Sequence, residues 1–216
     1  PSSTTCARSN PLVAPTKSNL FFYQEPTNDP SAPTKKLTLN FVNGFKVEDS
    51  RQNMFWGKNP DEIVYCAAAL GIVMNTSTLN QRYMGDGLSS EAKGHNDDIM
   101  TLGISPDRKL VVTGSLGARP DIIVWDSDNM KVLARNKLGR NTRAVVSIRF
   151  STDGKYFFCC DKHNDSNVYC FKTDTAELVG QNKCGAEVIF DGEAGANNVY
   201  ATATKRAVYF FQFNGS

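Results

Sequence analysis

The sequence is poor in the features that mark metal-binding, membrane and secreted proteins. It contains two histidines, His95 and His163, and no two cysteines stand at a two-residue spacing, so the usual zinc-ligand patterns are missing. No run approaches the roughly 18 consecutive apolar residues of a membrane-spanning helix. No basic and then apolar leader opens the chain, which starts at Pro1 and is interpreted as a processed product or an excerpt. We therefore expect no metal, no membrane contact and no secretory signal.

Six cysteines occur, and their surroundings favour free thiols over disulfides. A chain of 216 residues with many strand-like runs does not need disulfides to hold a small core. Cys159 and Cys160 lie next to each other in an apolar run, and neighbours on a strand point to opposite faces, so the two cannot share one site. We expect buried thiols in a reducing cytosol.

Net charge is low, at +2, but basic residues are clustered. The segment 131–149 carries six cations and no acidic residue. Such a cluster is either a solvated face or an electrostatic landing site for an acidic surface. The candidate partner-binding basic face consists of Lys131, Arg135, Lys137, Arg140 and Arg143.

The chain changes texture near residue 36. Residues 1–36 are rich in Ser, Thr, Pro and Asn, which predicts an extended or partly disordered segment, interrupted by the apolar Leu20–Tyr23. Residues 37–216 consist of short apolar runs separated by turns such as Ser105-Pro106-Asp107 and Thr152-Asp153-Gly154. Sustained helical periodicity is missing, which predicts an all-β fold.

An internal repeat narrows the fold further. Residues Ile99–Lys109 align with Val145–Lys155, and from Ser105 onward the offset of 46 positions holds again where Ile122–Trp125 meets Val168–Phe171. Weaker units run from Glu62 and from Glu187. A period near 40–45 residues with four strands per unit is typical of propeller blades. We therefore predict a partial β-propeller with about three to four four-stranded antiparallel blades visible.

One unit resembles a WD repeat. Gly94-His95 opens it and Trp125-Asp126 ends its third strand. The resemblance implies a structural signature in which a histidine, a strand Ser or Thr and a turn Asp bond with the Trp, and the positions here are His95, Thr113, Asp121, Trp125 and Asp126. Asp121 lies closer to Trp125 than the family's turn Asp does, so the bonding network is expected to be incomplete.

A narrower resemblance is to the echinoderm microtubule-associated protein-like family. Arg119–Ser127 is similar to a segment of that family, and Phe41–Phe45 with Asp49–Met54 resembles the hydrophobic motif that opens its propeller unit. We expect this motif, at about 41–56, to be buried between blades, because full burial of a large apolar side chain stabilises by ~1.5–3 kcal/mol. A propeller generally closes with more blades than are visible, so the chain is expected to join further blades of a longer parent.

The resemblance implies a non-catalytic scaffold of the microtubule cytoskeleton with tubulin or microtubules as partner, in the cytoplasm or an axoneme. The alternatives are a generic WD-repeat adaptor for peptide or ubiquitin-like partners and, third, a propeller-fold hydrolase. The sequence shows no catalytic constellation, so we expect no catalytic residue, no cofactor and no enzyme activity. The basic stretch lacks interleaved aromatic residues, so we expect no nucleic acid partner.

Overall fold

The computed structural model describes residues 31, 38–50, 52–85, 94–162 and 165–214. The chain divides into two compact units, Pro1–Leu37 and Thr38–Ser216, and Ser31, an exposed residue in a bend, is the part of the first unit that is described. The extended segment predicted for residues 1–36, with its apolar Leu20–Tyr23, otherwise lies outside the described residues.

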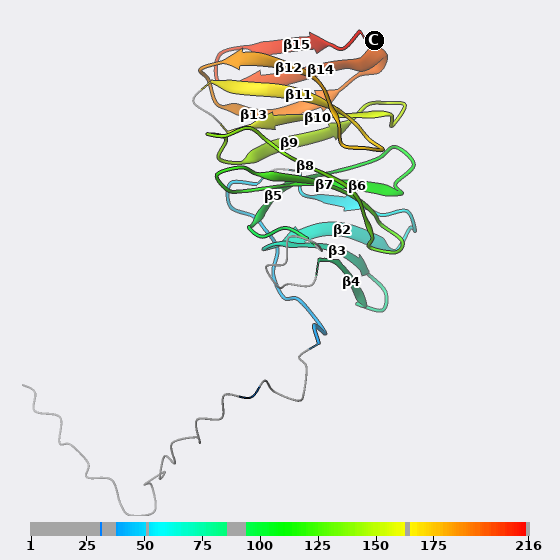
Figure 1. Cartoon of the computed structure of the whole chain (residues 1–216). Coiled ribbons are helices and arrows are strands. Elements are labelled where there is room, and N and C mark those ends of the chain that lie inside the picture. The colour runs from blue at the N-terminus through cyan, green and yellow to red at the C-terminus, as the bar shows by residue number, and fades with distance from the viewer. Residues whose placement is uncertain (1–30, 32–37, 51, 86–93, 163–164, 215–216) are drawn as a thin grey trace, which may run out of the picture. The chain divides into compact units, whose positions relative to one another are not determined.

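The second unit consists of four antiparallel sheets that follow one another along the chain (Figure 1). In each sheet, strands adjacent in sequence are hydrogen-bonded neighbours. The first sheet contains β1 (Met54–Trp56), β2 (Glu62–Ala67), β3 (Leu70–Asn75) and β4 (Gln81–Met84). The second contains β5 (Ile99–Ile104), β6 (Leu110–Ser115), β7 (Asp121–Asp126) and β8 (Val132–Lys137).

The third sheet contains β9 (Val145–Phe150), β10 (Tyr156–Asp161), β11 (Ser166–Lys172) and β12 (Leu178–Gly185). The fourth contains β13 (Ile189–Ala194), β14 (Val199–Thr204) and β15 (Val208–Gln212). The predicted all-β partial propeller is confirmed. The fourth sheet differs from the other three because it has three strands within the described residues, and its strand β15 forms an edge.

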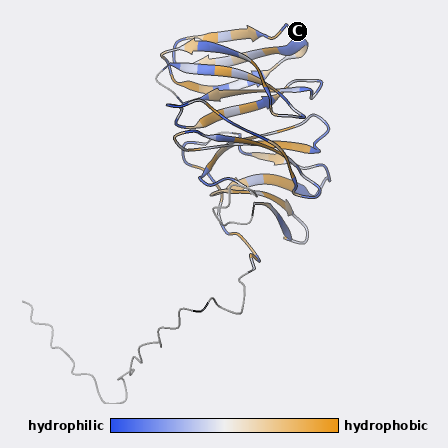
Figure 2. Cartoon of the chain, viewed as in Figure 1, coloured by the Kyte–Doolittle hydropathy of each residue, from blue (hydrophilic) through white to orange (hydrophobic). Residues whose placement is uncertain are grey.

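The sheets are stacked as propeller blades, and β5 of the second blade contacts β2 of the first. β5 packs against β9, and β9 packs against β13. The second and third blades therefore contribute both of their faces to the core, which explains why their strands are apolar on both sides. Figure 2 shows this pattern as apolar colour along the strands and polar colour in the connecting loops.

Three apolar clusters fill the spaces between consecutive blades. Trp125 and Met84 belong to the cluster between the first and second blades, and Phe157 and Val124 to the one between the second and third. Tyr200 stacks on Phe158 between the third and fourth, with ring centroids 5.1 Å apart. Burial at about 25 cal/mol per Å² of apolar surface makes these interfaces the main stabilising contribution.

The sequence repeat corresponds to a repeated turn. In the second blade Ser105 Oγ donates to Asp107 Oδ1 (2.6 Å), and in the third blade Ser151 Oγ donates to Asp153 Oδ1 at the same distance. These hydroxyl bonds lower the pKa of both carboxyl groups. Arg108 and Gly154, at equivalent positions, both have positive φ (59° and 71°). The shared turn explains why the offset of 46 positions is kept here.

The expectation that the hydrophobic motif at 41–56 is buried between blades holds for Phe55, which packs against the cluster between the first and second blades, and is wrong for its other large apolar residues. Residues 38–50 form no strand, and Phe41, Phe45, Met54 and Trp56 are between 38% and 57% exposed. Their segment lies over the outer face of the first blade, where Val42 joins an apolar cluster and the Phe45 ring lies 6.1 Å from that of Tyr65. Other residues of the segment reach the second and fourth blades, since Lys46 Nζ lies 3.4 Å from Asp98 and Gln52 Nε2 donates to Asp191 Oδ2 (2.6 Å).

The described residues also bear on the thiols and on membrane contact. The five described cysteines are free and buried, as expected, while Cys6 lies outside these residues. Burial raises the pKa of Cys66 to about 12 and that of Cys159 and Cys160 well above the usual range. No helix among the described residues is long and apolar enough to cross a membrane.

Candidate functional site

His95 forms the first part of the WD signature. It is 3% exposed, and its Nε2 lies 2.7 Å from Oγ1 of Thr113 on β6, so the two side chains share a hydrogen bond. Burial, together with the nearby positive charge of Arg135, lowers the pKa of His95 to about 3. The imidazole is therefore neutral at physiological pH, and its hydrogen bond to Thr113 connects the loop before β5 to β6.

The hydrogen-bond chain does not extend from Thr113 to Trp125. Trp125 on β7 is fully buried, and its Nε1 has no hydrogen-bond partner among the described residues. Its ring instead packs against β3 of the preceding blade, because a Cβ added at Gly71 would lie 2.8 Å from Trp125 Cζ2. Trp125 therefore fills the space between two blades, and Gly71 leaves room for it.

Asp121 and Asp126 stand at opposite ends of β7 and have separate tasks. The Asp121 carboxylate is 2% exposed and lies 3.7 Å from Lys137 Nζ and 3.9 Å from Arg135 Nη1. These two positive charges compensate its buried negative charge. Asp126 Oδ1 accepts hydrogen bonds from the backbone N–H groups of Asp128 (2.8 Å) and Asn129 (3.0 Å) and thus closes the turn to β8.

The third blade replaces the WD signature with a different polar cluster. At the offset of 46 positions, Cys159 and Phe171 stand where the second blade has Thr113 and Trp125. Buried Asp161 here accepts hydrogen bonds from the Tyr169 hydroxyl (2.7 Å) and from the Asn167 backbone N–H (2.7 Å). Sequence reasoning missed this cluster, although a polar residue at the end of an apolar strand was a signal that could have pointed to it.

The five residues of the candidate basic face are not gathered on one surface. Arg135 and Lys137 are half-buried and contact Asp121, and Arg135 Nη2 also donates to the Gly94 carbonyl (2.6 Å). Exposed Lys131 precedes β8, whereas Arg140 and Arg143 follow its far end. A strand of this length spans about 20 Å at ~3.3 Å per residue. Lys131 therefore lies at one end of the blades and the two arginines at the other.

Exposed cations gather where the loops of the second and third blades meet, with the exposed acidic residues Asp97 and Asp165 beside them. Backbone hydrogen bonds join these loops, from the N–H of Gly117 to the Arg143 carbonyl (2.9 Å) and from the N–H of Arg143 to the Lys162 carbonyl (3.1 Å). We call the exposed cations of these loops the basic loop surface; they are Arg119, Arg140, Arg143 and Lys162. The sequence had suggested Arg140 and Arg143, and tertiary structure adds the other two.

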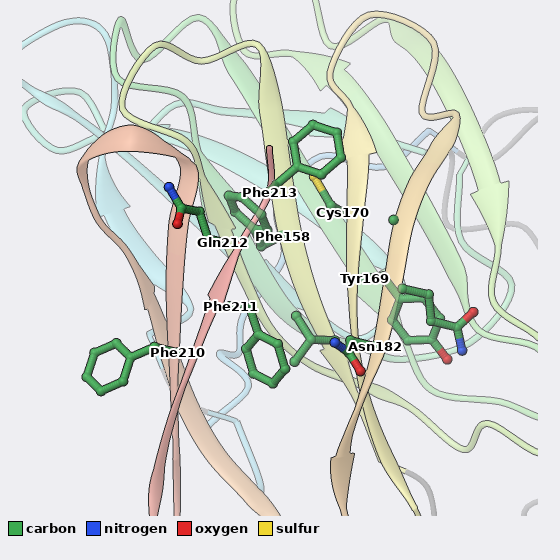
Figure 3. Close-up of a pocket in the computed structure, with 11 residues that line it drawn as sticks. Phe158, Tyr169, Cys170, Asn182, Phe210, Phe211, Gln212 and Phe213 are labelled. Carbon is green, nitrogen blue, oxygen red and sulfur yellow. The ribbon is translucent and has the colours of Figure 1, made fainter. Parts of the chain in front are cut away.

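A cavity of about 280 Å³ lies between the third and fourth blades (Figure 3). Phe158, Phe211 and Phe213 line it together with Cys170, whereas Phe210 points away from it and is 73% exposed. Burial raises the pKa of the Cys170 thiol to about 12, so this thiol stays protonated. The cavity lies beside the edge strand β15, and its lining also includes Gln181, Asn182 and Gln212.

Comparison with known proteins agrees with this architecture. The family model "HELP motif" matches residues 32–72, and the model "WD domain, G-beta repeat" matches residues 88–126 and 135–172. The solved structures of U3-55K and of the RRP9 WD40 repeats each cover 74% of this chain, with TM-scores of 0.58 and 0.59 at 14% identity. The chain covers 50% of each. It is therefore a WD-repeat propeller chain in which a HELP motif precedes the WD repeats.

Similar proteins identify the family of the chain more narrowly. The ciliary WD repeat-containing protein ctxp80 of Euplotoides octocarinatus is 32% identical over 78% of this chain, and human echinoderm microtubule-associated protein-like 1 is 30% identical over 85%. The 77 kDa echinoderm microtubule-associated protein of Lytechinus variegatus is 34% identical over 56%. The resemblance to the echinoderm microtubule-associated protein-like family is thus confirmed, and these proteins are homologues of the chain. The chain spans 24%, 23% and 18% of the length of these three relatives.

Proposed function

We propose that this chain is a non-catalytic scaffold of the microtubule cytoskeleton that contacts microtubules through the basic loop surface. The observation that carries the proposal is the exposure of four cations on loops joined by backbone hydrogen bonds. Acidic partners are attracted to such a surface over about 8–10 Å at physiological salt. We infer microtubules as the partner because two of the homologues are named as microtubule-associated proteins.

The interior of the described blades supports a structural role for the WD residues. His95 is neutral and shielded from solvent, and a general base must reach the proton that it removes. No group of three or more potential metal ligands is found among the described residues. The proposal therefore places binding at the loops and assigns the buried polar side chains to holding them in position.

Co-pelleting with stabilised microtubules tests the proposal. The double variant Arg143→Glu, Lys162→Glu reverses two charges of the basic loop surface, and the control Lys131→Glu, Lys155→Glu reverses two exposed charges at the opposite end. Exposed ion pairs contribute about 0.2–1 kcal/mol each. We expect the loop variant to weaken pelleting about 5-fold or more at low salt and the control to pellet like the original chain.

Equal pelleting of the two double variants would refute the basic loop surface as the contact. A pull-down that returns signalling proteins without tubulin would instead favour the generic adaptor. Salt should weaken the contact, because added ions screen exposed charges.

A further inference from the structure

A second groove opens where the second blade meets the third, beside the basic loop surface. Its volume is about 380 Å³, within the range of about 300–1,000 Å³ of ligand pockets. One wall is the end of β8 with the loop that follows it, Asn136 to Thr142, and the other wall comes from β11 and β12. None of the described residues that line the groove is acidic.

Two polar groups on opposite walls are uncommitted. Arg140 on the loop and Gln181 on β12 are exposed, and neither side chain has an ion pair or hydrogen bond among the described residues. The other amides are engaged: Asn136 Nδ2 donates to the Ala176 carbonyl (2.7 Å), and Asn167 Nδ2 donates to the Asp165 carbonyl (2.9 Å). Apart from Lys137, whose Nζ lies 3.7 Å from Asp121, a ligand in the groove therefore meets one guanidinium and one amide.

The rest of the lining is apolar or already satisfied. Leu138 and Phe171 are buried, and Leu178 adds an exposed apolar surface. The Tyr169 hydroxyl donates to buried Asp161, so it does not compete for a ligand. An aliphatic stem that ends in a carboxylate matches this lining, because the stem covers the apolar part and the two oxygens can accept from Arg140 and Gln181.

We propose that this groove takes a glutamate side chain from an acidic peptide segment of a protein partner. Arg143 and Lys162 of the neighbouring loops attract further acidic residues of the same segment. A phosphate group would call for several converging cations or backbone N–H groups, whereas one guanidinium and one amide suit a carboxylate. The proposal deepens the proposed function, because it rests on an acidic partner and names the part of that partner that binds.

Fluorescence anisotropy with a labelled ten-residue polyglutamate peptide tests the groove on the whole chain. Arg140→Glu removes the guanidinium, and Lys131→Glu makes the same charge change at the opposite end of the blades. We expect Arg140→Glu to raise the Kd about 10-fold, as loss of one charge-assisted bond predicts, and Lys131→Glu to change it less than about 2-fold. An equal effect of both variants would show diffuse attraction and overturn the proposal.

A steric variant tests occupancy without changing charge. A Cβ at Gly139 would have no neighbour within 4 Å, and this glycine lines the groove, so Gly139→Trp places a ring there without displacing the backbone. We expect it to weaken peptide binding about as much as Arg140→Glu does. Unchanged peptide binding by Gly139→Trp, with an unchanged thermal unfolding midpoint, would show that the groove is empty in the complex.

The two proposals can fail separately. If the peptide binds through the groove but the chain does not pellet with microtubules, the proposed function falls and the groove remains. If Gly139→Trp does not weaken peptide binding while the original chain pellets with microtubules, the groove proposal falls and the microtubule contact remains.

Discussion

We expect the original chain to lose stability on mild acidification, and we expect substitution of His95 to remove this loss. The pKa of His95 is about 3 in the folded chain, because burial and the charge of Arg135 oppose protonation, and an unfolded histidine has a pKa near 6.5. Between these values the unfolded chain binds a proton that the folded chain does not bind. The free energy of unfolding therefore falls as pH falls below about 6.5.

The magnitude follows from the two pKa values. Proton binding to the unfolded histidine lowers the free energy of unfolding by about 2 kcal/mol between pH 7 and pH 5, and the slope approaches ~1.4 kcal/mol per pH unit at the lower end. Asp107 and Asp153 have lowered pKa values, and the stability that they contribute is lost as pH falls below the ordinary carboxyl range near 4. The interval from pH 7 to pH 5 therefore reports on histidine.

Urea unfolding followed by circular dichroism at pH 7, 6 and 5 measures this slope. His95→Gln keeps a polar partner for Thr113 and cannot titrate, so we expect lower stability at pH 7, by about 1–3 kcal/mol, but little dependence on pH above 5. A flat profile in the original chain, or an unchanged slope in His95→Gln, would refute the reasoning.

Two further predictions concern the interior. Gly71→Ala should lower the free energy of unfolding by about 1–3 kcal/mol, because the new Cβ would lie 2.8 Å from the Trp125 ring. In the control Gly139→Ala the new Cβ meets open space, so this variant should unfold at the same temperature as the original chain. Equal unfolding midpoints for both variants would contradict the packing of Trp125 against Gly71. Cys159 and Cys160 should resist iodoacetamide in the folded chain at pH 8 and react in urea, because burial raises their pKa and blocks access, and rapid labelling of the folded chain in mass spectrometry would count against this.

Local chemistry made the blades predictable from sequence. The turn that begins at Ser105 and the turn that begins at Ser151 use the same hydroxyl–carboxylate bond, so their sequences repeat at a fixed offset. The burial of the hydrophobic motif was not predicted correctly from sequence, because apolar composition indicates that side chains favour burial but not which residues pack over them. Phe45 packs on Tyr65, while Trp56 remains 57% exposed because the first blade has a described neighbour on one face.

The sequence by itself determined the all-β blades and the repeated turns, because each depends on residues within one blade, and the resemblance to a WD repeat implied the pairing of His95 with Thr113. Only the tertiary structure decided which cations are available to a partner. Arg135 turned out to be bound to Asp121 and the Gly94 carbonyl, while Lys162 joined Arg143 across a loop contact. Charge spacing along a chain cannot show this, because a strand separates its two ends and the stacking of blades brings distant loops together.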